Sequence, residues 1–317
     1  MEFIGINAPF IKQYIEFKRT LGYAFKDTHN LRIFDRFTAD NGSKTIGLTK
    51  ELAEKWAEKR PNESEVTKYK RTGDVINFLR YLHHLGYDSY IPRQVKAYRS
   101  TFTPYIFSHE ELKAFFAAAD THEVHRTSTM KYILPVIFRV IYGCGLRANE
   151  ALSLKCGDVH LDEKYIVIHE PKNGHDRMLP ISGSLADICA LYKKRYLKKH
   201  SKEDYFFAQK NMRRHSVDTL YEWFRKILWE AGISHGGKGT GPRVHDLRHT
   251  FSVHSLETMS RSGLDLYYSL PILSKYLGHQ SLEATDGYVR LTLEMYPELV
   301  GKIDNLCAYV FPEVKIQ

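Results

Sequence analysis

Apolar residues at helical spacing fill the first hundred residues and do most to restrict the fold. Four segments carry this pattern with short polar joints between them: FIKQYIEFKRTLG, LRIFDRFTADNG, LTKELAEKWAEKR and TKYKRTGDVINFLRYLHHLG. Apolar residues three and four positions apart lie on one face of a helix. Three of the segments also end at or near glycine, as helix C-termini often do. We therefore expect a helical domain over residues 1–100.

The pattern changes after residue 92, which indicates a domain boundary. Residues 93–105, RQVKAYRSTFTPY, show no clear periodicity and are interpreted as a linker. Ser108 followed three positions later by Glu111 is typical of a capping box that opens a new helix. A second domain is therefore expected over residues 106–317.

The second domain is expected to be mostly helical with one small β element. KYILPVIFRVIYGCG has the composition of a buried helix ended by Gly143 and Gly145. In KYIVIHEPKNGHDRMLPIS, Asn173-Gly174 stands between possible strands, which is a strong hairpin signal. From residue 184 onward the pattern is helical again. The predicted fold class is mainly α with a small β-sheet or hairpin, in two domains.

The charge balance favours an anionic partner. Lys and Arg number 46 against 37 for Asp and Glu, which gives a net charge of +9. Such an excess biases a protein toward polyanions such as nucleic acid. In the first domain, basic residues are assigned to the polar helix faces: Lys68, Lys70, Arg71 and Arg80.

The cysteines and the N-terminus indicate a cytoplasmic protein without a structural metal. The four cysteines contain no C-x-x-C pair, so neither a zinc ribbon nor a disulfide framework is expected: Cys144, Cys156, Cys189 and Cys307. The first twenty residues lack a signal-peptide pattern, and no apolar run reaches the length of about 18 residues that a membrane span needs.

The segment GPRVHDLRHTFSVH sets two imidazoles beside a guanidinium. His245 and His249 have the spacing of the zinc-protease pattern H-E-x-x-H, but Asp246 stands where that pattern has Glu. Arg248 would also place a positive charge beside a dication. We therefore expect no metal here, and a phosphodiester fits better because Arg presents a planar fork to two phosphate oxygens. His249, deeper in the apolar run, is expected to pack behind His245 and Arg248.

Further cations and a nucleophile stand elsewhere in the chain. Phosphoryl transfer without metal needs a second cation, and YGCGLRANEALSL supplies Arg147 with Glu150 placed to orient it. Lys172, just before the hairpin turn, is a third candidate, although hairpin lysines are usually solvated. YLGHQSLEATDGYVR adds His279 and, nine positions on, Tyr288. A tyrosine nucleophile needs cations or a base nearby because its pKa is about 10; Tyr276 and Tyr296 are the local competitors.

Taken together, GLRANEAL, the hairpin lysine, HDLRHTF, LGHQS and the following tyrosine resemble the tyrosine recombinases of the phage integrase family, over roughly residues 106–300. The resemblance implies roles for these side chains at a scissile DNA phosphate. Arg147 and Arg248 would clamp the phosphate, supported by Glu150. The remaining roles fall to His245 and His279 as hydrogen-bonding groups that help proton transfer, Lys172 as general acid and Tyr288 as nucleophile of a 3′-phosphotyrosyl link.

The resemblance also implies a biological setting. Residues 1–100 would be a core-binding domain on DNA, and a homotetramer would exchange strands through a Holliday junction without any cofactor, serving a mobile element. The alternatives are a type IB topoisomerase-like enzyme, an inactive DNA-binding regulator and, last, a metallohydrolase. The tail NLCAYVFPEVKIQ is expected either to dock on a neighbouring subunit or to fold back on its own domain.

Overall fold

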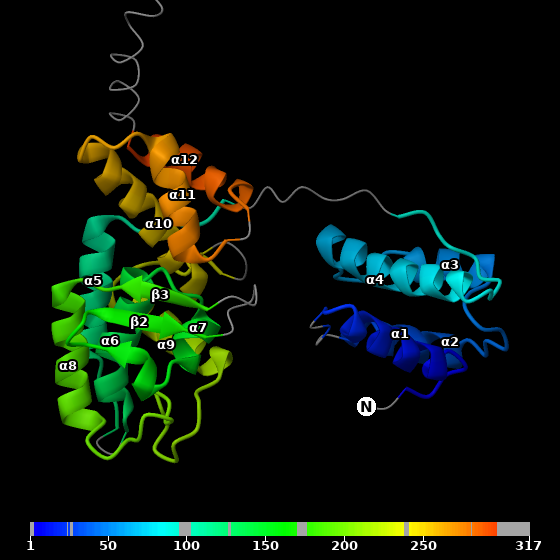
Figure 1. The fold of residues 1–317 in the computed structure, drawn as a ribbon, viewed down its shortest axis with the longest axis horizontal. Helices are drawn as coiled ribbons and strands as arrows, with labels where there is room; N and C mark the ends of the chain where they lie inside the picture. Colours follow the sequence, from blue (N-terminus) through cyan, green and yellow to red (C-terminus); the bar gives the residue numbers. More distant parts are fainter. Residues whose placement is uncertain are drawn as a thin grey trace, which may run out of the picture. The chain divides into compact units, whose positions relative to one another are not determined.

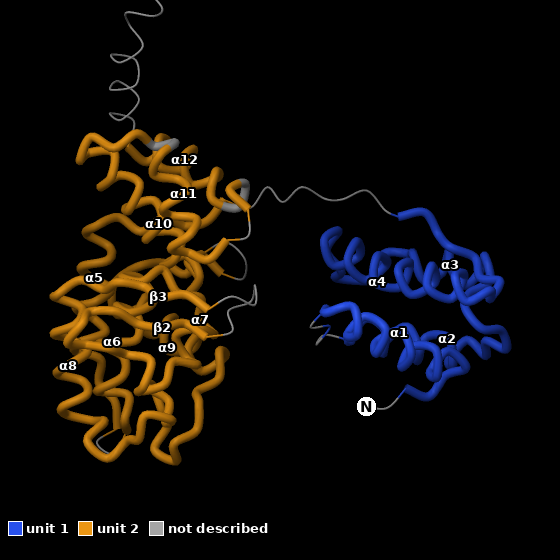
Figure 2. Tube along the Cα trace, viewed as in Figure 1, with its two compact units in different colours: residues 1–102 blue, residues 103–317 orange. Residues whose placement is uncertain are grey.

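The chain divides into two compact units, residues 1–102 and 103–317 (Figure 2). The computed structural model describes residues 3–23, 25, 28–94, 103–125, 128–169, 176–237, 241–279 and 281–296. Most of the expected linker lies outside these residues, as do the C-terminal tail and Lys172.

The first unit contains four described helices, as the apolar spacing predicts (Figure 1). They are α1 (Ala8–Thr20), α2 (His29–Asp40), α3 (Lys50–Ala57) and α4 (Glu65–His84). Thr49 and Ser64 cap α3 and α4 by accepting hydrogen bonds from backbone N–H groups of the first turn. The large apolar side chains that these helices share form one buried core: Ile11, Phe34, Trp56, Phe78 and Leu79.

The assignment of Arg71 to a polar, exposed helix face is wrong. Its side chain is 2% exposed, and its Nε and Nη2 donate to the two carboxylate oxygens of Glu63 at 2.7 and 2.8 Å. The same guanidinium donates to the backbone carbonyls of Trp56 and Glu58 and lies against the Trp56 ring. Spacing alone could not show that α3 and its C-terminal loop cover this face of α4.

The second unit is built mostly from helices around the buried helix α6. The helices are α5 (His109–Thr121), α6 (Met130–Gly143), α7 (Ala148–Ser153), α8 (Gly183–Tyr196), α9 (Val217–Glu230), α10 (Val244–Arg261), α11 (Leu266–Leu277) and α12 (Glu283–Met295), with a short 3₁₀ helix η1 (Cys156–Asp158). The capping box before α5 is confirmed. Ser108 Oγ accepts from Glu111 N at 3.1 Å, and a Glu111 carboxylate oxygen accepts from Ser108 N at 2.8 Å.

A three-stranded antiparallel sheet accompanies these helices (Figure 1). Its strands are β1 (Val159–His160), β2 (Tyr165–Ile168) and β3 (Arg177–Pro180), and Ile168 pairs with Arg177 next to the expected turn. The paired strands confirm the β element predicted from the sequence, and the fold is mainly α with a small sheet. The Asn173-Gly174 turn itself lies outside the described residues.

Helix α10 links the two parts of the second unit. It contacts α6 on one side and α11 and α12 on the other. Leu247 belongs to the main core, whereas Val253 and Leu256 pack with Leu277 and Tyr288 in a smaller cluster. Among the described helices, none has both the length and the apolar character to cross a bilayer.

Candidate active site

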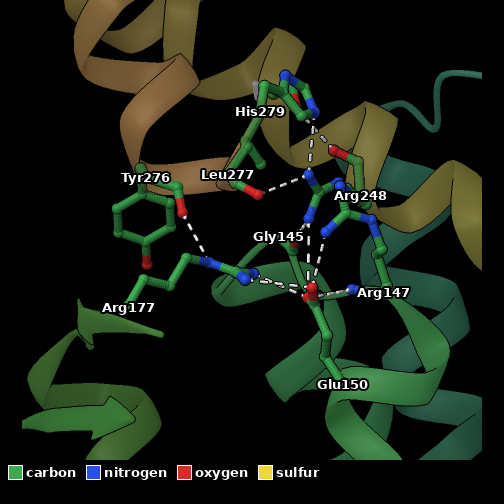
Figure 3. Close-up of polar contacts among 9 residues, drawn as sticks. Gly145, Arg147, Glu150, Arg177, Arg248, Tyr276, Leu277 and His279 are labelled. Carbon is green, nitrogen blue, oxygen red and sulfur yellow. Dashed lines mark hydrogen bonds and ion pairs between the residues drawn. The ribbon is translucent and has the colours of Figure 1, made fainter. Parts of the chain in front are cut away.

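Glu150 is the centre of the polar cluster shown in Figure 3. Helix α7 starts directly after Arg147, whose backbone N–H donates to Glu150 Oε2 at 2.9 Å and whose Nη1 donates to Oε1 at 2.7 Å. Glu150 is 8% exposed. One carboxylate therefore both caps α7 and holds Arg147.

The turn before Arg147 requires glycine. Gly145 has φ +58°, a conformation that favours glycine, and a Cβ there would stand 2.6 Å from a ring carbon of Phe251. The close approach lets the Gly145 carbonyl accept a hydrogen bond from Arg248 Nη1 at 2.6 Å. The glycine thus joins the turn that carries Arg147 to the helix that carries Arg248.

Arg177 belongs to the cluster and was not singled out from the sequence. Its Nη1 and Nη2 donate to the two oxygens of Glu150 at 3.1 and 2.8 Å, and its Nε donates to the Tyr276 carbonyl at 3.2 Å (Figure 3). The signal in the sequence is a single charge at the start of the strand RMLP. At Gly278, with φ +67°, a Cβ would lie 3.2 Å from the Arg177 side chain. Arg177 therefore fastens β3 to Glu150 and to the end of α11.

Arg248 is the most deeply buried cation of the site, at 1% exposure. Besides Gly145, its Nη2 contacts the Leu277 carbonyl at 2.8 Å and His279 Nε2 at 3.0 Å. Its Nη1 is 3.9 Å from Glu150 Oε2. Burial, reinforced by Arg147, lowers the pKa of Arg248 to about 10, so the side chain stays cationic at neutral pH.

The three arginines share one carboxylate, which leaves an excess of positive charge. Burial acts to raise the pKa of Glu150, but the contacts with Arg177 and Arg147 outweigh it, and the net shift is downward. Glu150 is therefore ionised at neutral pH. Three guanidinium groups against one carboxylate form a site suited to an anion.

His279 lies in the turn between α11 and α12 and has both ring nitrogens engaged. Its Nε2 faces Arg248, which can only donate, so Nε2 accepts and Nδ1 carries the hydrogen. Nδ1 lies 2.8 Å from Thr285 Oγ1, which accepts that hydrogen. Burial and the nearby arginines lower the pKa of His279 to about 4, so its ring is neutral at pH 7.

The other two histidines occupy successive turns of α10. His245 is exposed, and its ring lies 4.7 Å from that of His249 in an edge-to-face arrangement. The expectation that His249 packs behind the site is wrong, because its Nδ1 lies 2.8 Å from Tyr288 Oη. Asp246 is buried and accepts from the backbone N–H of Arg243 at 2.7 Å, so it caps α10.

Of the three candidate tyrosines, Tyr288 on α12 is the one in contact with His249 and His279. It is 6% exposed, and its ring stacks on His279 with centroids 6.4 Å apart. Burial raises its pKa, opposed by Arg248, Ser252 and Arg147. Tyr276 instead donates its hydroxyl hydrogen to the Pro180 carbonyl at 3.0 Å, and Tyr296 packs near His254.

The structure thus brings five of the six predicted catalytic residues, and Glu150, together in one cluster of the second unit. Lys172, the sixth, lies outside the described residues. Within the described part of the chain, no three His, Cys, Asp or Glu side chains gather as a metal site would require.

Residues 106–295 match the phage integrase family. A putative integrase/recombinase, y4rB of Sinorhizobium fredii, is 28% identical over 306 residues, covering 93% of this chain and 96% of that protein. The tyrosine recombinase XerA of Pyrococcus horikoshii is 33% identical over 169 residues, 53% of each chain, so this chain spans about half of that relative.

A solved structure shows the same fold. The integrase of the transposon Tn1549, in complex with a circular intermediate DNA, superposes with a TM-score of 0.62. The match covers 88% of this chain and 94% of that one, at 15% sequence identity.

Proposed function

This chain belongs to the phage integrase family of tyrosine recombinases, and from that premise we propose how its site cuts and rejoins DNA. The chain is a site-specific DNA recombinase, and double-stranded DNA is its partner. The observation that carries the assignment of the site is the sharing of Glu150 by Arg147, Arg177 and Arg248. That excess of positive charge suits a phosphodiester, and it suits the doubly charged pentacoordinate transition state even better.

In this proposal, Arg147 and Arg248 bind the non-bridging oxygens of the scissile phosphate. Tyr288 Oη attacks phosphorus, a 3′-phosphotyrosyl bond forms, and the bond to the 5′ oxygen breaks. Lys172 protonates that leaving oxygen, His245 hydrogen-bonds the phosphate, and His279 holds the Arg248 guanidinium in place beside it. The new bond retains the energy of the old one, so a 5′ hydroxyl from the partner strand reverses the reaction without ATP or a metal.

The wider arrangement follows from strand exchange. Four copies of the chain on two DNA sites would exchange two pairs of strands through a Holliday junction, and the helical first unit would help hold the duplex. The likeness to a transposon integrase supports a role in moving a genetic element. Since its substrate is genomic or element DNA, we place the enzyme in the cytoplasm.

The test is covalent trapping on nicked suicide DNA containing the recombination site. We expect the wild-type chain to form a phosphotyrosyl adduct and Tyr288→Phe to bind the same DNA without forming it. Tyr276→Phe and Tyr296→Phe are the matched controls and should keep the adduct.

Three results would contradict the proposal. Adduct formation by Tyr288→Phe would reassign the nucleophile. A wild-type chain that binds DNA without an adduct would fit the inactive regulator. Relaxation of supercoiled plasmid without any joining of two sites would fit the topoisomerase alternative.

A further inference from the structure

The hydroxyl of Tyr288 must lose a proton before it can attack phosphorus, and the buried surroundings of this side chain make the loss harder. The residue is 6% exposed, and burial raises its pKa despite the opposing effect of Arg248. Phenol is a weak nucleophile while it keeps its proton. A base within hydrogen-bonding distance of Oη is therefore needed.

His279 is poorly placed to be that base. Its Nε2 lone pair already accepts a hydrogen bond from Arg248, and its Nδ1 hydrogen is directed at Thr285. Protonation of Nε2 would set two positive groups against each other 3.0 Å apart. The ring of His279 thus orients Arg248 and has no free lone pair for the tyrosine.

His249 has the geometry that His279 lacks. Its Nδ1 is 2.8 Å from Tyr288 Oη, within the range for direct proton transfer, and the two ring centroids are 5.6 Å apart. His245, one helical turn earlier, contacts the ring of His249 at a centroid distance of 4.7 Å. The described contacts therefore place His249 between the exposed His245 and the buried nucleophile.

We propose that His249 is the general base for Tyr288, a role that rests on the recombinase function proposed above. In the cleavage step, the Oη–H proton moves to His249 Nδ1, the bond from Oη to phosphorus forms, and the bond from phosphorus to the 5′ oxygen breaks. The 5′ oxygen takes its proton from Lys172. In the joining step, the incoming 5′ hydroxyl gives its proton to Lys172 and its oxygen bonds to phosphorus, while the proton on His249 returns to Oη as the phosphotyrosyl bond breaks.

The charges around His249 keep its ring able to accept a proton. Burial, together with Arg243 just before α10, Arg248 on α10 and His279, lowers the pKa of His249 to about 4. The ring is therefore neutral at pH 7 before DNA binds. A phosphate bound at Arg248 adds a negative charge nearby, which raises the pKa of His249 toward the value that a general base needs.

The test compares variants that separate proton acceptance from positioning. Asn at position 249 can present an oxygen near the place of Nδ1, so His249→Asn keeps a hydrogen-bond acceptor for Tyr288 but cannot hold a proton. We expect its single-turnover cleavage rate on suicide DNA to fall about 100-fold or more. The control, His254→Asn, makes the same substitution in the same helix at a histidine that bonds Tyr142 instead, and should cleave at the wild-type rate.

Restoring the cleavage rate of His249→Asn by a more acidic nucleophile would show that this variant lacks proton transfer. Replacing Tyr288 by 3,5-difluorotyrosine, whose phenol is more acidic, should restore most of the His249→Asn rate, and raising the pH should speed this variant more than the wild type. A His249→Asn variant that cleaves at the wild-type rate would overturn the proposal. So would a slow variant with an unchanged melting temperature that neither fluorination nor high pH restores, since that result means positioning only.

These outcomes are distinct from failure of the proposed function. If the wild-type chain forms no adduct at Tyr288, the recombinase chemistry itself is wrong. If the wild-type adduct forms and the His249 variants cleave normally, only the assignment of the base is wrong.

Discussion

Each unit of the chain buries an arginine almost completely, and the two are held in different ways. Arg71 in the first unit meets both oxygens of Glu63, at 2.7 and 2.8 Å, so one positive group faces one negative group. Its contact is the first cause of the lowered pKa of Glu63. Arg248 in the second unit is held by the carbonyls of Gly145 and Leu277 and by His279, with its nearest carboxylate oxygen 3.9 Å away.

The difference distinguishes a structural arginine, Arg71, from Arg248, for which we propose a role in binding an anion. A buried charge matched by a bidentate carboxylate has no attraction left for a ligand. A buried charge that hydrogen-bonds only neutral groups, and that shares one carboxylate with two further arginines, keeps that attraction. Arg248 therefore keeps the attraction for an anion that its proposed role at the scissile phosphate requires.

The largest expected effect is on chemistry at Arg248. Arg248→Lys keeps the charge but loses the planar guanidinium. Of the three hydrogen bonds to Gly145, Leu277 and His279, we expect two to be lost. We expect single-turnover cleavage to fall about 10³-fold with little change in DNA affinity. Arg139→Lys is the control, since Arg139 makes a bidentate pair with Asp120 in the same unit but outside the site. Comparable losses in both variants would show that Arg248 acts on cleavage only through the stability of the fold.

The next effect is on the stability of the first unit. Arg71→Met leaves Glu63 buried without its partner, and we expect the free energy of unfolding of that unit to fall by about 3–5 kcal/mol. Urea denaturation followed by Trp56 fluorescence, with Trp223 and Trp229 replaced by Phe, measures it. The double variant Arg71→Met, Glu63→Leu should recover most of the loss. An unchanged urea midpoint in Arg71→Met would show that the pair is not structural.

The smallest effect is expected at Arg177, which combines features of both arginines. It pairs with a carboxylate as Arg71 does, but that carboxylate also holds Arg147. Arg177→Lys should lose one hydrogen bond and slow cleavage about tenfold, which corresponds to about 1.4 kcal/mol. The cleavage assay used for Arg248→Lys measures this too. A loss as large as that of Arg248→Lys would place Arg177 among the phosphate-binding groups.

Local patterns were sufficient to predict most elements of the fold. Apolar spacing predicts the helices of the first unit, and Ser108 with Glu111 predicts where α5 begins, because both depend on neighbours within one or two turns. The two-residue strand β1 is too short to leave a periodic signal. The buried state of Arg71 depends on Trp56 and Glu63, which arrive from outside its helix.

In the site, too, local sequence patterns predict some residues, whereas contacts between distant segments determine others. Motifs predict Arg147, Arg248, His279 and Tyr288 because each lies in a distinctive local context. Arg177 was missed because its importance comes from a carboxylate 27 positions earlier in the chain. His249 was assigned to the core because apolar residues follow it, although its spacing of four from His245 already placed both on one helix face. The roles of the residues themselves stay predictions until the trapping experiments are done.

The hydrogen bonds around Gly145 join residues that lie far apart in the sequence, and this separation affects how the enzyme folds during translation. The hydrogen bond from Arg248 to Gly145 joins residues 103 positions apart, and the contact of His249 with Tyr288 spans a further 39. A domain whose contacts are so distant in sequence gains them late, after most of its chain has left the ribosome. During translation, the arginine cluster cannot close until α10 emerges, and Tyr288, the proposed nucleophile, is added only with α12. With these proposed roles, the growing polypeptide cannot cut DNA before α12 is made, so the ability to cut arrives together with the ability to rejoin.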